Sequence, residues 1–240
     1  MNLHFITSIS PAYWHSVAKY CIPTWNLPGK VTVYIDQHEG DLNWLNEVPY
    51  DKILLQTPPL EIDGSDAERG KVIKFWGKSC AQIHAVLNVE ESLERVERII
   101  WLDADIEQIG EAPDSLFNFE FKQDFALMNS DDGKDCWESG LVIFNQEAKK
   151  IRSAMKEYRD VWNDPDILHS LWKPYDAQVI GYVAKQRGFV NLCERSCKNV
   201  NALSNTRYAK TFKHWINKTN KKILFEKHNE NSDLPLNDTK

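Results

Sequence analysis

Strand-like and helix-like segments alternate along this chain, and that alternation constrains its fold more than any other feature. Short apolar runs that are rich in β-branched residues and bounded by polar residues indicate buried strands. Six such runs are present: Leu3–Ile9, Val31–Ile35, Ile53–Leu55, Ile99–Leu102, Phe125–Met128 and Leu141–Phe144. Four segments repeat apolar residues at helical spacing: Tyr13–Cys21, Lys71–Leu87, Ala148–Trp162 and Asp176–Lys185. The pattern predicts an α/β domain with a Rossmann-like, mostly parallel central sheet flanked by helices.

Length and composition favour a single domain with a substantial core. The 240 residues suit one α/β domain, and 42% of them are hydrophobic, which is enough to fill its interior. We assign residues 1–228 to this domain. Residues 229–240 are hydrophilic and lack periodicity, so we expect a polar tail there. The polar stretch Pro58–Gly70 is predicted to be a loop over the ligand-binding edge of the sheet.

Charge and apolar patterning narrow the class of partner and the location. The formal net charge is −6, which argues against a sequence-independent electrostatic grip on nucleic acid by the whole surface. No secretory leader pattern opens the sequence, and no apolar run approaches the roughly 18–20 residues of a membrane helix. We therefore expect a cytoplasmic protein, in a bacterium or in a phage-infected host cell.

Two carboxylates, Asp103 and Asp105, stand at the end of the fourth predicted strand. Because they are two residues apart, both side chains are expected to enter the crevice beyond the carboxyl ends of the strands, where open α/β sheets bind ligands. Carboxylate oxygens suit Mg²⁺ or Mn²⁺, and such an ion neutralises the charge on a departing nucleotide diphosphate. The motif predicts a site for a divalent metal and a diphosphate.

Other enzyme classes fit the same residues less well. Phosphatases of the haloacid-dehalogenase type also use an Asp-x-Asp motif, but on the first strand and followed by Thr or Val. Here the motif is on the fourth strand and Ile106-Glu107 follows it. Glycine-rich phosphate loops are absent, which disfavours P-loop enzymes and dinucleotide dehydrogenases.

Four further segments carry polar or small residues in a definite order along the chain. They are the lysine-bearing helix Lys71–Lys78, the segment Trp137–Asn145 with a Ser-Gly pair, the acidic helix start Lys173–Gln178, and the histidine–lysine segment Lys213–Lys218. With the Asp-x-Asp motif in its place among them, residues 3–228 resemble the GT-A glycosyltransferases. In layout the chain is most similar to the group of glycogenin and the lipopolysaccharide galactosyltransferases.

This resemblance implies a set of contacts to a nucleotide-sugar donor. The first strand would present Thr7 and Ser8 to the base and ribose, and the second strand would present Asp36 to the base. Lys78 would contact a phosphate or the sugar; a solvated lysine face is the alternative explanation of its helix. Ser139 and Gly140 would line the donor-sugar pocket ahead of an apolar strand, and Asp103 would also reach the donor.

The resemblance also implies the reacting and metal-binding groups. Asp176 and Gln178 would lie near the anomeric carbon, although Asp176 also suits a helix N-cap. His214 would complete the metal site of Asp103 and Asp105. Three lysines are candidates for the diphosphate, Lys218 first and then Lys221 and Lys222, because the family's usual Gly and Lys-Pro-Trp residues are replaced here by Asn217 and Lys221-Lys222-Ile223. His228 is a competing ligand.

The implied activity is a metal-dependent transfer of a sugar from a nucleotide-diphosphate sugar, UDP-linked by family expectation, to an acceptor hydroxyl with retention of configuration. Asp176 would be a general base only in an inverting enzyme. The acceptor is a glycan or a hydroxylated base in phage DNA, whose backbone the basic stretch Arg207–Lys227 would suit. An inactive nucleotide-sugar-binding module is the alternative, and an Asp-x-Asp phosphatase a weaker one.

Overall fold

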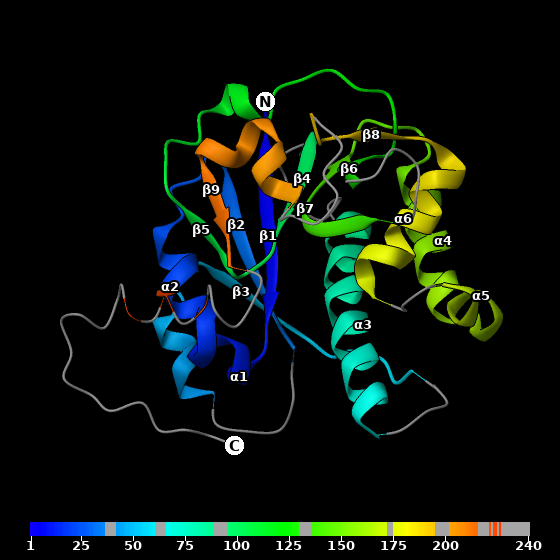
Figure 1. The fold of residues 1–240 in the computed structure, drawn as a ribbon, viewed down its shortest axis with the longest axis horizontal. Helices are drawn as coiled ribbons and strands as arrows, with labels where there is room; N and C mark the ends of the chain where they lie inside the picture. The colour runs from blue at the N-terminus through cyan, green and yellow to red at the C-terminus, as the bar shows by residue number, and fades with distance from the viewer. Residues whose placement is uncertain are drawn as a thin grey trace.

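A helix-flanked sheet of seven strands forms the centre of the chain (Figure 1). The computed structural model describes residues 1–36, 42–60, 66–88, 96–129, 136–171, 175–194, 202–215, 221, 223, 224 and 226. The strand order is β3-β2-β1-β4-β7-β6-β8. The strands are β1 (Leu3–Ile9), β2 (Lys30–Asp36), β3 (Asp51–Leu55), β4 (Arg98–Leu102), β6 (Phe125–Asn129), β7 (Trp137–Asn145) and β8 (Phe189–Asn191). Two short strands, β5 (Ile106–Gln108) and β9 (Phe212–His214), form a separate sheet.

The sheet is mostly parallel, as its sequence predicts. Strand β1 runs parallel to β2 and β4, β2 to β3, and β6 to β8, whereas β7 is antiparallel to both of its neighbours. The reversed direction of β7 places its first residues beside the last residues of β4, with Leu141 opposite Leu102. The Asp103 amide then donates to the Gly140 carbonyl at 2.9 Å, which fixes the backbone at the end of β4.

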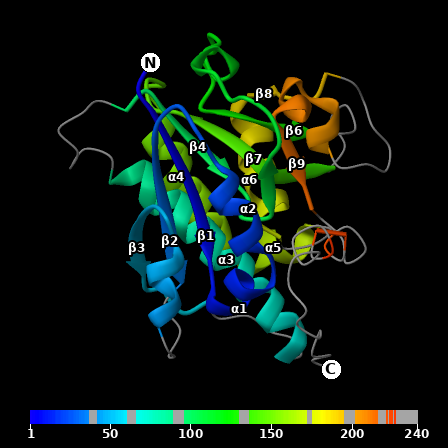
Figure 2. The ribbon, with the colours of Figure 1, turned by 90° about the vertical axis from the view of Figure 1, so that its left-hand side faces the viewer.

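Helices cover both faces of the sheet. On one side lie α3 (Asp66–Leu87), α4 (Ile151–Trp162), α5 (Pro165–Ser170) and α6 (Asp176–Arg187), and on the other α1 (Pro11–Tyr13) and α2 (Lys19–Cys21) (Figures 1 and 2). Successive residues of β4 serve the two layers in turn, because strand side chains alternate between faces. Ile99 and Trp101 pack with the α3 layer, whereas Ile100 and Leu102 pack on the other side. Each such buried side chain contributes about 1.5–3 kcal/mol.

The six predicted strands are all present, but three short ones escaped prediction. β5, β8 and β9 have only three residues each, too few to produce a periodic pattern. The expectation that Gly140 precedes an apolar strand is also wrong, since β7 begins at Trp137 through its pairing with β6. No helix within the described ranges combines the length and the apolar composition that a membrane span requires.

Helix boundaries differ from the predicted ones for local reasons. The first helical segment begins at Pro11, where the Ser10 side chain accepts a hydrogen bond from a backbone amide and proline occupies the first turn, and it continues through a π-helical stretch. α3 begins at Asp66, so the second part of the predicted loop Pro58–Gly70 is helical. α4 begins at Ile151 because Asn145 accepts from the Glu147 amide and turns the chain first. Residues 229–240 lie outside the described part.

Candidate functional site

A pocket of about 390 Å³ lies at the edge of the sheet where β1, β2 and β4 end and β7 begins. This is the crevice in which open α/β sheets bind ligands. Its lining comes from seven parts of the chain: Ser8, Ile9, Ser10 and Tyr13; Asp36; Lys74, Phe75, Gly77 and Lys78; Asp103, Ala104 and Asp105; Trp137, Glu138, Ser139 and Gly140; Tyr175, Asp176 and Ala177; and His214. Most of the residues that the sequence singles out therefore meet in one cavity.

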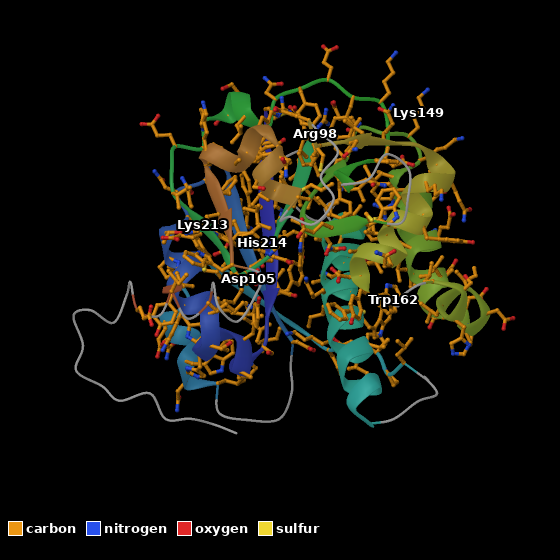
Figure 3. All side chains as sticks on the ribbon, viewed as in Figure 1. Arg98, Asp105, Lys149, Trp162, Lys213 and His214 are labelled. Atoms are coloured by element: carbon orange, nitrogen blue, oxygen red, sulfur yellow. The ribbon has the colours of Figure 1, made fainter. Side chains whose placement is uncertain are left out.

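Asp103, Asp105 and His214 form a compact group of metal-ligating side chains. Each contributes one ligand atom, and these atoms lie within 4.8 Å of one another. His214 Nε2 is 3.0 Å from Asp105 Oδ1 and 3.7 Å from Asp103 Oδ2. The short pairing of β5 with β9 sets Ile106 opposite His214 and so carries the imidazole to the motif (Figure 3). Two carboxylates and one imidazole suit a divalent ion such as Mn²⁺.

The backbone of Gly140 makes room for the imidazole of His214. A Cβ atom at residue 140 would stand 2.7 Å from His214 Cε1 and 2.9 Å from Nδ1, distances that no side chain tolerates. On the other side of the ring, Glu138 Oε1 is 3.8 Å from Nδ1. The imidazole is thus confined with Nε2 directed toward Asp103 and Asp105, which is the orientation that a ligand requires.

Charge in the metal group is balanced by neighbouring cations. Burial would raise the pKa of Asp105, but the hydrogen bond and charge of His214 and the charge of Lys221 hold it well below its usual range. Burial opposes protonation of His214, yet the hydrogen bond that the imidazole donates to Asp105 and the charges of Asp105, Asp103 and Glu138 raise its pKa. The same electrostatic field that favours a protonated imidazole favours a divalent cation.

Lys78 joins the metal group to the other acidic residue of the pocket. Its Nζ is 2.8 Å from Asp103 Oδ1 and 3.4 Å from Asp176 Oδ2. Burial lowers the pKa of Lys78, but the charges of the two carboxylates outweigh it and raise that pKa. Lys221 Nζ is 3.1 Å from Asp105 Oδ2, so each Asp of the motif has its own lysine.

Asp176 points into the pocket and does not cap its helix. The N-cap residue of α6 is Tyr175, without a side-chain cap, and Asp176 is the first helical residue, 2% exposed. Ser139 Oγ donates to Asp176 Oδ2 at 2.6 Å. A carboxylate in the first turn of a helix is stabilised by the helix dipole. Capping as the explanation of Asp176 is therefore wrong, and the residue belongs to the pocket.

The remaining predicted site residues are only partly brought together. Ser8 and Asp36 line the pocket, and Asp36 accepts a hydrogen bond from Thr57 at 2.8 Å. Thr7 is fully buried and does not line the pocket, because adjacent residues of β1 face opposite sides. Gln178 is buried in α6 and is not among the lining residues, since positions two apart on a helix do not share a face.

Several predicted or competing residues fall where the structure gives no placement. Lys218, Lys222 and His228 lie outside the described residues. Within the described part of the chain, the metal group consists of Asp103, Asp105 and His214. Of the three candidate lysines only Lys221 has a described position, against Asp105.

Sequence reasoning did not assign Tyr13 or Lys74 to the site. Lys74 Nζ lies 4.6 Å from the centre of the Tyr13 ring, and Lys221 Nζ lies 5.1 Å from it. Burial, followed by the charges of Asp105 and Asp103, raises the pKa of Tyr13 well above its ordinary value. The helical spacing of Lys71, Lys74 and Lys78 in the sequence could have pointed to Lys74. No sequence pattern pointed to Tyr13.

Comparisons with known proteins find similar folds among solved structures but no match in sequence. No protein-family model matches the chain, and no curated protein sequence matches it. Among solved structures, galactosyltransferase LgtC with donor and acceptor sugar analogues superposes with a TM-score of 0.56 at 7% identity, over 97% of each chain. A glycosyltransferase involved in glycosylation of the major capsid of PBCV-1 gives 0.53 at 11% identity, over 93% of this chain and 99% of the other.

A third structure covers a part of a longer protein. The glycosyltransferase GlyE of Streptococcus pneumoniae TIGR4 superposes with a TM-score of 0.51 at 14% identity, over 80% of this chain. The chain spans about 45% of the length of GlyE. Together these similarities show that the chain shares the fold of these glycosyltransferase structures, which is the fold class that the sequence predicts.

Proposed function

We propose that this chain, which has the GT-A glycosyltransferase fold, is a metal-dependent glycosyltransferase that takes a sugar from a nucleotide-diphosphate donor. One observation carries the proposal: the group Asp103, Asp105 and His214 opens into the same pocket as Lys78 and Asp176. A metal site beside a lysine and a buried carboxylate supplies the positive charge that a diphosphate needs and a negative group for the reacting sugar. The fold similarity supports sugar transfer over phosphatase chemistry.

The donor is proposed to lie along the pocket with its base toward Ser8 and Asp36. Its diphosphate would lie between the metal group and Lys74, Lys78 and Lys221, whose ammonium groups lie over or against residues of this pocket. A divalent ion held by Asp103, Asp105 and His214, Mn²⁺ or Mg²⁺, would neutralise the charge that develops on the departing diphosphate. UDP is the nucleotide that we propose for this donor.

Asp176 is proposed to lie beside the reacting sugar and to act through its charge. Its Oδ2 already accepts a hydrogen bond from Ser139 and faces Lys78 at 3.4 Å. A carboxylate held by two such partners presents a fixed negative charge, which stabilises positive charge at the anomeric carbon. This role fits retention of configuration, and NMR of the initial product anomer tests it.

The proposed acceptor is a glycan hydroxyl. The chain has a net charge of −6. Net charge of this sign repels a DNA backbone. Binding to duplex DNA that carries hydroxylated bases, measured at low salt and again at 200 mM salt, would overturn this choice of acceptor if it proved strong and salt-sensitive.

Two measurements test the proposal. Thermal-shift screening of nucleotide sugars with and without Mn²⁺ should find a donor that raises the melting temperature only with the metal, because a ligand that binds the folded state stabilises it. Asp105→Ala should abolish that metal-dependent stabilisation. Slow hydrolysis of the donor in the absence of acceptor separates an enzyme from an inactive binding module; binding without any hydrolysis or transfer would favour the module.

A further inference from the structure

A fully buried tryptophan of β4 reaches the carboxylate of the Asp-x-Asp motif. Trp101 is 0% exposed, and its Nε1 donates to Asp103 Oδ1 at 2.9 Å. The two residues are two positions apart, so both side chains leave the chain on the face that α3 covers. The indole ring lies within a packed core cluster, and close packing restricts the movement of such a side chain.

The two oxygens of Asp103 therefore have different roles. Oδ1 receives the Trp101 N–H and the Lys78 ammonium group, the latter at 2.8 Å. Oδ2 is the oxygen that faces His214 Nε2, at 3.7 Å. Lys78 is itself drawn to the indole, with Nζ 5.8 Å from the ring centre. One oxygen of the carboxylate is held from behind and the other is presented to the metal group.

Asp105 is held differently. Its Oδ1 faces His214, its Oδ2 faces Lys221, and it also accepts a hydrogen bond from the hydroxyl of Tyr13, a pocket residue. Tyr13 and Lys221 are half-buried, whereas Trp101, the donor to Asp103, is fully buried. The Trp101 bond therefore supports the Asp103 carboxylate from inside the fold.

We propose that Trp101 is a positioning residue that holds Asp103 with Oδ2 directed at the metal, an inference that rests on the proposed metal-dependent function. Without the indole N–H, the carboxylate is free to turn both oxygens toward Lys78, and its ligand oxygen is lost from the metal group. Hydrogen bonds of this outer kind typically change metal affinity by about 10–100-fold.

The test is the dissociation constant of Mn²⁺ alone, measured by EPR on nucleotide-free protein. Trp101→Phe should weaken Mn²⁺ binding by about tenfold. The matched control is Trp76→Phe, which removes an equally buried indole N–H bond, to the Pro58 carbonyl at 2.9 Å, away from the metal group. The control should bind Mn²⁺ within about twofold of wild type, a difference below the outer-shell effect.

Two further variants separate positioning from packing. Replacing Trp101 by benzothienylalanine, in which sulfur takes the place of the N–H, keeps the shape of the ring and should weaken Mn²⁺ binding as much as phenylalanine does. In an Asp103→Asn background, Trp101→Phe should cause no further loss, because the effects of residues that act through one another are not additive.

The outcomes distinguish this inference from the proposed function. If wild type binds Mn²⁺ and either the benzothienylalanine variant or Trp101→Phe binds it equally well, the role of Trp101 is overturned but the proposed function is not. The role of Trp101 is also overturned if Trp101→Phe weakens Mn²⁺ binding as much in the Asp103→Asn background as it does in wild type. Wild type that binds no Mn²⁺, with or without a nucleoside diphosphate, overturns both.

Discussion

The imidazole of His214 packs on the backbone of Gly140, with Cε1 only 2.7 Å from the point where a Cβ atom would stand. Any larger residue at this point must displace the ring from Asp105, to which His214 Nε2 lies at 3.0 Å. One glycine within β7 thus decides whether β9 can complete the metal group. Residues far apart in the sequence are coupled through this single close contact.

Gly140→Ala is expected to weaken Mn²⁺ binding at least tenfold and to destabilise the fold by about 1–3 kcal/mol, the usual cost of forcing a group into a packed site. Isothermal titration and chemical denaturation measure the two effects. Gly70→Ala is the matched control, because a Cβ there meets no atom within 4 Å. It lies within α3 and should stabilise the protein by about 0.5–1 kcal/mol without changing Mn²⁺ affinity. Unchanged Mn²⁺ affinity in Gly140→Ala would contradict the role of His214.

Lys221→Met is expected to have effects of opposite sign on two ligands. The lysine occupies Asp105 Oδ2 at 3.1 Å and so competes with a cation, but it is also a proposed diphosphate contact. The variant should bind Mn²⁺ alone several-fold more tightly and Mn²⁺ plus UDP about 10–100-fold more weakly, since one charge-assisted contact contributes about 1.5–3 kcal/mol. Lys210→Met, an exposed lysine with the same change in net charge, should alter neither affinity. A change of the same sign in both affinities would refute the exchange of partners.

Asp176→Asn is expected to reduce catalysis and leave donor binding nearly intact. The amide keeps the shape of the side chain and can still accept from Ser139, but the fixed negative charge beside the sugar is lost. The rate of donor hydrolysis and of transfer should fall by about 10²–10³, the typical loss for one preorganised charge or donor. The dissociation constant of the donor, measured by titration, should stay within about threefold. Equal losses in binding and rate would assign Asp176 to donor binding instead.

The stability of the fold should depend on pH through His4. Burial and the charge of Lys30 lower the pKa of His4 to about 4, from 6.5, and its Nε2 lies 2.8 Å from Thr32 Oγ1. Between pH 6.5 and pH 4 the unfolded chain binds a proton that the folded chain does not. Stability from this residue is therefore complete above pH 6.5 and is lost as the pH falls toward 4, by at most about 3 kcal/mol.

The His4→Gln variant isolates this contribution. Glutamine is uncharged at every pH and retains a polar group near Thr32. Urea denaturation at pH 7 and pH 4.5 should show a smaller loss of unfolding free energy in the variant than in wild type. Equal losses in both proteins would mean that His4 titrates in the fold as it does in the unfolded chain.

Much of the fold and the centre of the site could be predicted because local pattern determines them. Asp103 and Asp105 end a buried apolar strand, so their direction follows from the strand itself. Asp176 and Ser139 are neighbours only in the folded chain. The sequence pointed to each of them through the order of segments that resembles the family. Their direct hydrogen bond could not be read from the sequence.

The errors and omissions have a common physical origin in tertiary packing. Thr7 and Ser8 are equally polar, and only the register of β1 decides that Ser8 faces the pocket. Gln178 lies on a face of α6 that does not line the pocket, because the helix begins at Asp176 and positions two apart on a helix point in different directions. Trp101 resembles any core residue in the sequence, and its hydrogen bond to the motif appears only in the folded molecule.

The most direct test of the account is the release of nucleoside diphosphate from a panel of nucleotide sugars, followed by mass spectrometry in Mn²⁺ and in EDTA. We predict that wild type releases the diphosphate from at least one donor in Mn²⁺, that EDTA stops the release, and that Asp105→Asn lowers its rate at least 10²-fold, as expected when a charge-stabilising group is removed. Release that is indifferent to EDTA and to Asp105→Asn, or no release from any donor, would contradict metal-dependent sugar transfer at this pocket.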